Sequence, residues 1–77
     1  MNGYTNYETW NIALWISNDE FLNRIMTFNA RGDYETFLRI SKYWGFEKTP
    51  DNVRYDDPKI NKTEVTDKYK NPNSNNV

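Results

Sequence analysis

The sequence predicts an all-α protein, in which a compact bundle of three short helices precedes a turn-rich strip and a short C-terminal helix. Apolar residues recur at helical spacing, capping residues precede the apolar runs, and glycines follow two of them. The expected helices cover about residues 6–17, 19–30, 34–44 and 61–70. An α+β fold with a short hairpin is the alternative, because apolar residues also alternate at positions 10, 12, 14 and 16, as in a strand.

The first helix is expected to organise the fold. Thr5 and Glu8 fit a capping box, in which Thr5 accepts from the Glu8 amide and the Glu8 side chain reaches back to Thr5. The helix is apolar on two sides, so it is expected to pack between two neighbours. One predicted face carries Tyr7, Trp10, Ala13 and Leu14, and the other carries Ile12, Trp15 and Ile16.

The next two helices are bounded by capping residues and glycines. Asn18 is a good N-cap for the second helix, and Asp19 and Glu20 suit the positive end of its dipole. Gly32 fits the left-handed position after that helix, and Asp33 then caps the third helix, which Gly45 ends. The expected core residues are Phe21, Leu22, Ile25, Met26 and Phe28 from the second helix, and Phe37, Ile40 and Trp44 with Tyr34, Leu38 and Ser41 from the third.

The chain after Gly45 is expected to cross the helices as an extended, turn-rich strip over residues 46–58. Pro50-Asp51-Asn52 is typical of a turn, and Phe46, Val53 and Tyr55 are expected to hold the strip against the helices. Asn61 and Glu64 suit the start of the last helix, which Ile60, Val65 and Tyr69 would anchor. Residues 1–70 are therefore expected to form one domain and residues 71–77 a disordered tail.

Composition argues against catalysis and favours an aromatic core. The 77 residues include three Trp, six Tyr and four Phe but neither Cys nor His, which removes thiolate and imidazole chemistry. We therefore expect no enzyme, no cofactor and no metal. The net charge is −1 and both signs alternate along the chain, which indicates solvated faces rather than a surface for polyanions. With no long apolar run and no signal-peptide pattern, a cytoplasmic protein is expected.

Two blocks of sequence resemble a known family. Residues 4–11, YTNYETWN, are followed by Ala13-Leu14-Trp15 and by Asn18-Asp19-Glu20, and a later block reads TPD and VRYDDP over residues 49–58. Together they are similar to a family of small uncharacterised proteins of bacteriophage and plasmid genomes. Ser17 and Phe21 depart from that pattern, in which an acid and a glycine would stand. The resemblance implies a small accessory protein of a mobile element, working in a bacterial cytoplasm, and implies no activity.

The leading hypothesis is a non-enzymatic module that binds a host or phage protein through an aromatic surface patch. If the downstream helices cover only one side of the first helix, its other side becomes an exposed apolar patch, the usual mark of a protein contact. Burial of that side under residues 46–60 is an equal alternative. The expected contact residues are Ile12, Trp15 and Ile16, with Tyr4 and Tyr7 at the rim.

The second hypothesis is a nucleic-acid-binding accessory protein. Arginines attract phosphates and tyrosines stack on bases, although acids between them favour ordinary solvated faces. The residues concerned are Arg24, Arg31, Tyr34, Arg39, Lys42 and Tyr43. A third hypothesis, metal-dependent activity at the turn that carries Asp51, Asp56 and Asp57, is weaker, because adjacent carboxylates before a proline usually cap backbone amides.

Overall fold

The chain is helical, as the sequence predicts. The computed structural model describes residues 3–70, and over them the helices are α1 (Tyr7–Asn18), α2 (Glu20–Arg24), the π-helical turn η1 (Ile25–Asn29), α3 (Tyr34–Tyr43) and α4 (Lys62–Lys70). The hairpin of the α+β alternative does not form within residues 3–70, where strand-like pairing is limited to an isolated antiparallel bridge between Lys48 and Arg54. The tail expected at residues 71–77 lies outside the described residues.

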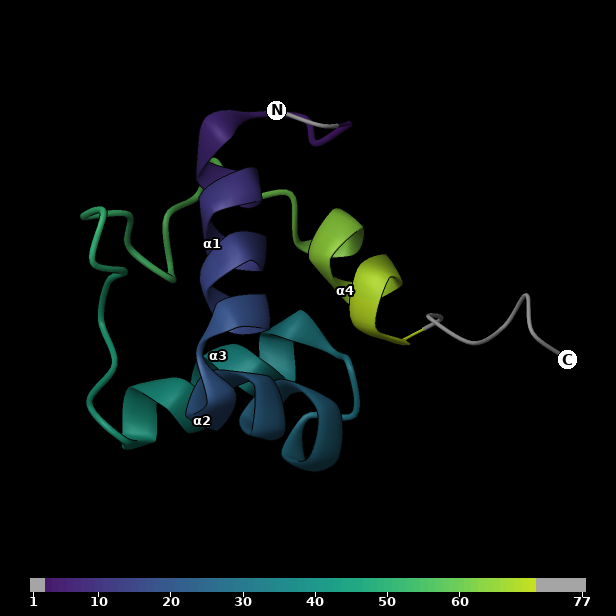
Figure 1. Cartoon of the computed structure of the whole chain (residues 1–77), viewed down its shortest axis with the longest axis vertical. Coiled ribbons are helices and arrows are strands. Elements are labelled where there is room, and N and C mark those ends of the chain that lie inside the picture. The colour runs from purple at the N-terminus through teal and green to yellow at the C-terminus, as the bar shows by residue number, and fades with distance from the viewer. Residues whose placement is uncertain (1–2, 71–77) are drawn as a thin grey trace, which may run out of the picture.

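Helix α1 stands at the centre of the fold (Figure 1). Helix α4 packs beside it, while α2 with η1 and α3 lie across its C-terminal end. The strip of residues 44–61 runs along the remaining side of α1 and returns over its N-terminal end to reach α4. Helix α1 is therefore enclosed by segments from both halves of the chain, which agrees with its predicted role as organiser.

The caps of the first two helices lie one residue later than predicted. Asn6, not Thr5, caps α1, because its Oδ1 accepts from the Thr9 amide at 2.8 Å while its Nδ2 donates to the Lys59 carbonyl at 2.7 Å. The Thr5 amide and hydroxyl instead donate to the carboxylate of Glu64, at 2.9 and 2.6 Å. Asp19, not Asn18, caps α2 through the Leu22 amide. The first correction arises because Glu64 of α4, far along the chain, binds the residue that was expected to cap α1.

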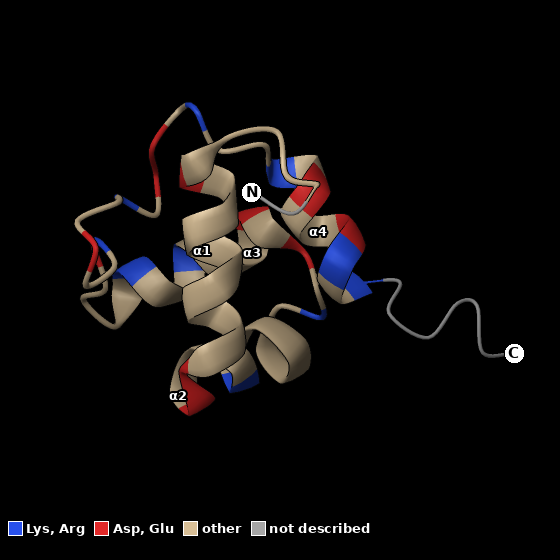
Figure 2. Ribbon diagram, turned by 45° about the horizontal axis from the view of Figure 1, so that its top comes forward, with Lys and Arg blue, Asp and Glu red and all other residues tan. Residues whose placement is uncertain are grey.

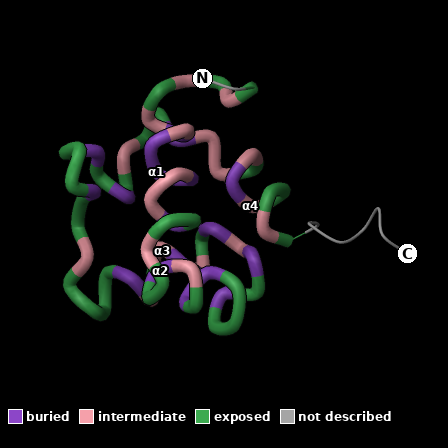
Figure 3. The backbone as a smooth tube through the Cα atoms, viewed as in Figure 1, coloured by how far each residue is buried: buried purple, intermediate pink, exposed green. Residues whose placement is uncertain are grey.

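The core lies where α1, η1, α3, α4 and the strip meet (Figure 3). Three aromatics expected in it are exposed: Phe21 by 46%, Trp44 by 59% and Phe28 by 76%. Trp44 lies at the C-cap of α3, beyond the last turn that packs on the core. The buried apolar residues are Ile12, Ala13, Ile16, Leu22, Ile25, Met26, Ala30, Tyr34, Phe37, Val53, Tyr55, Ile60 and Val65.

Phe28 is exposed because the second helix ends in a π-helical turn. The Ala30 amide donates to the Ile25 carbonyl, five residues earlier, at 2.8 Å. This wider turn places Ile25, Met26 and Ala30 in the core and leaves residues 27–29 outside. Regular α-helical spacing, on which the prediction depended, does not hold across this turn.

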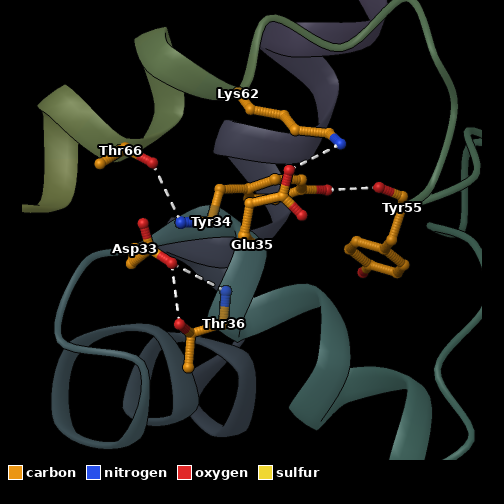
Figure 4. Close-up of polar contacts among 7 residues, drawn as sticks. All are labelled: Asp33, Tyr34, Glu35, Thr36, Tyr55, Lys62 and Thr66. Carbon is orange, nitrogen blue, oxygen red and sulfur yellow. Dashed lines mark hydrogen bonds and ion pairs between the residues drawn. The ribbon is translucent and has the colours of Figure 1, made fainter.

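The start of α3 is tied to α4 and to the strip (Figure 4). The buried Tyr34 donates its hydroxyl to the Tyr55 carbonyl at 2.6 Å and its amide to the Thr66 hydroxyl at 3.0 Å. Lys62 of α4 pairs with Glu35 at 3.0 Å. Asp33 caps α3 as predicted, accepting from the amide and hydroxyl of Thr36, and these bonds hold the pKa of Asp33 below its usual value.

Gly32 is the point where the turn before α3 meets the end of α4. Its φ is +84°, in the predicted left-handed region, and a Cβ there would lie 2.6 Å from the Cα of Lys70. The approach of two backbones therefore requires glycine at this position, beyond the requirement of the turn itself.

Candidate protein-binding surface

The predicted patch on α1 is not an exposed surface. Ile12 and Ile16 are fully buried in the core. Trp15 is half-buried, and its indole N–H donates to the carboxylate of Asp51 in the strip at 2.8 Å. Of the two arrangements open to this side of α1, the structure has the one in which it is covered, so Ile12 and Ile16 are inaccessible to a partner.

Asn11 links α1 to the strip from inside the protein. Its amide nitrogen donates to Asp51 at 2.8 Å, and its amide oxygen accepts from the hydroxyl of Thr49 at 2.7 Å. The hydrogen bonds from Trp15 and Asn11 hold the pKa of the Asp51 carboxyl below its usual value. This network joins the two sequence blocks that carry the family resemblance, so several of their residues maintain the fold.

The two predicted rim residues, Tyr4 and Tyr7, have different surroundings. Tyr4 lines a shallow hollow of about 150 Å³ together with Trp10, Leu14 and Lys68. Tyr7 is 41% exposed and its ring lies 5.6 Å from that of Trp10. Tyr4 therefore belongs to a different surface from Trp15, whereas the Tyr7 hydroxyl accepts from the side-chain amide of Asn11 at 3.5 Å and so adjoins the network.

A separate cluster of aromatic side chains, in which Phe21, Tyr43 and Trp44 are exposed and Phe46 is half-buried, lies where α2 meets the end of α3. We call it the aromatic patch: Phe21, Tyr43, Trp44 and Phe46. The ring of Phe21 lies 5.8 Å from that of Trp44, edge to face, and 5.7 Å from that of Phe46. Tyr43 extends the cluster, with its ring 5.8 Å from Trp44 and an exposed fraction of 83%. Four adjoining aromatics at a surface form the kind of apolar area that marks protein contacts.

A small hollow of about 60 Å³ adjoins the aromatic patch beside Phe46. Arg54 and Asp56 form its polar wall, with Arg54 Nε donating to Asp56 Oδ1 at 2.8 Å and Nη2 donating to Oδ2 at 3.2 Å. This contact holds the pKa of Asp56 below its usual value, and the positive charge of Lys42 acts in the same direction. Lys42 and Glu47 complete the charged part of the lining.

The residues of the nucleic-acid hypothesis are not gathered on one face. Tyr34 is fully buried, so it is not a stacking surface. Arg24 pairs with Glu20 at 3.4 Å, and Arg31 lies in the turn before α3 with a φ of +53°. Arg39, Lys42 and Tyr43 remain exposed together on α3. Acidic and basic residues alternate over the ribbon, with no continuous basic stripe in the view of Figure 2.

The carboxylates of the strip have structural partners. Asp51 accepts from Asn11 and Trp15, Asp56 from Arg54, and Asp57 from the Lys59 amide at 2.8 Å. Over residues 3–70, His, Cys, Asp and Glu side chains form no group of three that could hold a metal ion. Within the same part of the chain, every helix is too short or too polar to cross a membrane.

The sequence does not predict the aromatic patch, because its pattern assigns Phe21, Trp44 and Phe46 to packing and leaves Tyr43 only as a candidate for base stacking. A usable signal was present in Tyr43-Trp44-Gly45-Phe46, three aromatics around a glycine at a predicted helix end. Consecutive aromatics at such an end cannot all face one core, because successive helical residues point about 100° apart. The contribution of Phe21 carried no comparable signal.

Comparison with known proteins gives a family for the chain. Neither the curated proteins nor the solved structures include a match. A family model, described as a family of unknown function, DUF7249, matches residues 1–75. The match covers nearly the whole chain, and the chain belongs to this family of unknown function.

Proposed function

We propose that this protein is a non-enzymatic accessory module that binds a host or phage protein through the aromatic patch. The observation that carries the proposal is the cluster of Phe21, Tyr43, Trp44 and Phe46, whose rings contact one another at the surface. Aromatic side chains are the commonest hot-spot residues of protein interfaces because they bury large areas at small entropic cost. The expected setting, a bacteriophage or plasmid protein in a bacterial cytoplasm, is supported by the resemblance of residues 4–20 and 49–58.

A nucleic-acid-binding role is the second candidate. The exposed Tyr43 and Trp44 could stack on bases, while Arg39 and Lys42 on the same helix could contact phosphates. The carboxylate of Glu47 beside Phe46 would repel a phosphate backbone there. This charge pattern is why we place protein binding first.

Site-specific photocrosslinking in bacterial cells tests the proposal. A photoreactive phenylalanine analogue replaces Tyr43 in the patch, and in a matched control it replaces Phe28, which is exposed by 76% but has no ring contact with the patch. The expected result is a discrete protein adduct from position 43 and none from position 28. A Trp44→Ala substitution should remove the adduct.

Three outcomes would count against this function. They are no adduct from position 43, equal adducts from both positions, or an adduct that survives Trp44→Ala. Recovery of nucleic acid in place of protein would favour the second candidate. Thermal unfolding of Trp44→Ala should differ from the native chain by no more than about 1 kcal/mol, because the side chain is already 59% exposed, so loss of the adduct would not reflect unfolding.

A further inference from the structure

The exposed area of the aromatic patch limits the kind of partner that it fits. With about 200 Å² for each fully exposed aromatic side chain, the exposed fractions of Phe21, Tyr43 and Trp44 correspond to roughly 400 Å². A stable interface between two globular proteins buries about 800 Å² on each partner. The patch alone is therefore too small for a second copy of this chain, and it suits a single peptide segment that reaches into the hollow beside Phe46.

The charges next to the aromatic patch favour an acidic segment. On α3, the carboxylate of Glu35 is bound by Lys62, so the exposed charges of this helix that remain without an ion pair are those of Arg39 and Lys42. Neither base is in an ion pair with any residue of the described part of the chain. In the hollow, Asp56 is already bound by both Arg54 nitrogens. Glu47 is the remaining acid of that lining, so bases outnumber acids among the unpaired groups.

The same charges disfavour a nucleic-acid strand. A strand that tracks the patch needs several phosphate contacts, because its affinity comes mainly from counterion release. Two unpaired bases on α3, with the carboxylate of Glu47 beside Lys42, supply few such contacts. A peptide needs only one apolar side chain for the patch and one or two carboxylates for α3.

We propose that the aromatic patch and the basic side of α3 together hold one short peptide segment of the partner, with an apolar anchor side chain and neighbouring carboxylates. The anchor packs on the exposed surfaces of Phe21 and Trp44, and a carboxylate pairs with Lys42 at the mouth of the hollow. This inference rests on the proposed function and specifies the chemistry of its partner.

Selection of random twelve-residue peptides displayed on a surface, with the full-length chain as bait, tests this chemistry without knowledge of the partner. Enriched peptides should share an aromatic or branched aliphatic residue with Asp or Glu nearby. A synthetic peptide of that consensus should lose at least about tenfold in affinity on Trp44→Ala, as expected for a hot spot. Lys42→Glu should weaken it about three- to tenfold and reduce its salt dependence.

Lys68→Glu is the matched control, since it makes the same charge change on α4, which lies on the other side of α1 from the end of α3 (Figure 1). That variant should bind the peptide as the native chain does. The inference is overturned by the absence of enrichment, by basic consensus peptides, or by equal binding to Lys42→Glu. It is also overturned if an oligothymidine strand displaces the peptide, or if sedimentation shows a dimer that Trp44→Ala dissociates.

The two experiments fail separately. If crosslinking at position 43 recovers a protein but the selected peptides are basic, the patch binds proteins and only the inferred chemistry is wrong. If position 43 gives no protein adduct, the proposed function itself fails.

Discussion

The buried amide of Asn11 shows how a single residue holds two distant segments together. It is completely inaccessible, yet its amide group has partners on both ends, Asp51 and Thr49, about forty residues away. A buried polar group is tolerated only when its hydrogen bonds are made, and removal of one partner leaves the other groups buried without a hydrogen bond. The residue therefore specifies where the strip docks on α1.

Replacement of Asn11 by alanine should lower the free energy of unfolding by about 1–3 kcal/mol, because Thr49 loses a buried acceptor and a small cavity is left. Chemical denaturation measures this change. Asn18→Ala is the control, since Asn18 is exposed at the end of α1 and should change stability by less than about 0.5 kcal/mol. Equal effects of the two substitutions would show that the network contributes nothing.

Gly32 is needed because a side chain there would collide with the backbone of α4. Gly45 is the comparison, since it has the same left-handed backbone but no neighbouring atoms. Both have positive φ, +84° and +89°, but a Cβ at Gly45 would meet open space while one at Gly32 would meet the Lys70 backbone. Alanine at either position should cost about 1 kcal/mol for the left-handed backbone. Gly32→Ala should cost clearly more, as measured by thermal unfolding, because α4 must move. Similar losses for both would refute the close approach.

At the scale of elements, the sequence predicted the helices well because local signals define them. Asp33 and Asn61 cap α3 and α4 as expected, since each accepts from an amide three residues later. Gly32 and Gly45 take the left-handed conformations expected after a helix. These features depend on short stretches of chain, so they can be predicted without the tertiary structure.

The candidate site was less predictable because it depends on which faces tertiary packing leaves open. The apolar pattern of α1 correctly predicts two buried sides, but it does not indicate that Asp51 of the strip binds the indole of Trp15. Helical spacing likewise placed Phe21, Phe28 and Trp44 inside. Those three residues are exposed because α2 is short, because a π-helical turn follows it, and because α3 ends at Tyr43. No local sequence pattern predicts the π-helical turn.

The register of η1 can be tested with two of its residues. Met26 is fully buried and Phe28 is 76% exposed, although they are two positions apart. Met26→Ala should therefore cost about 2–5 kcal/mol of stability, and Phe28→Ala less than about 1 kcal/mol. Denaturant titration distinguishes them. A larger loss from Phe28→Ala would mean that this turn has α-helical spacing, with Phe28 in the core.

At the scale of the whole molecule, hydrogen-bonded carboxylates should make the free energy of unfolding decrease at acidic pH. Hydrogen bonds from Thr36, Trp15, Arg54 and Thr5 respectively lower the pKa values of Asp33, Asp51, Asp56 and Glu64 from ordinary values of 3.8 for aspartate and 4.5 for glutamate. The folded state thus binds protons less readily than the unfolded chain. The resulting stabilisation is present above the ordinary values and is lost as pH falls through the lowered ones.

The thermal midpoint should accordingly be nearly constant from about pH 7 to 5 and should fall below about pH 4. Asp51→Asn should reduce this acid dependence while keeping an acceptor for Trp15. Asp67→Asn, at an exposed position of α4 with no side-chain hydrogen bond to a described residue, should leave the dependence as it is. A midpoint that rises on acidification would contradict the hydrogen-bonded carboxylates.

The contacts of α1 also determine when the protein can fold during synthesis. Thr5, just before α1, binds Glu64, and the buried side-chain amide of Asn11 binds Thr49 and Asp51. Ser17, near the C-terminal end of α1, binds Tyr69. Translation delivers α1 first and these partners last. A nascent chain that has reached residue 45 therefore holds the central helix without most of its polar partners, and stable folding must wait until α4 has emerged from the ribosome.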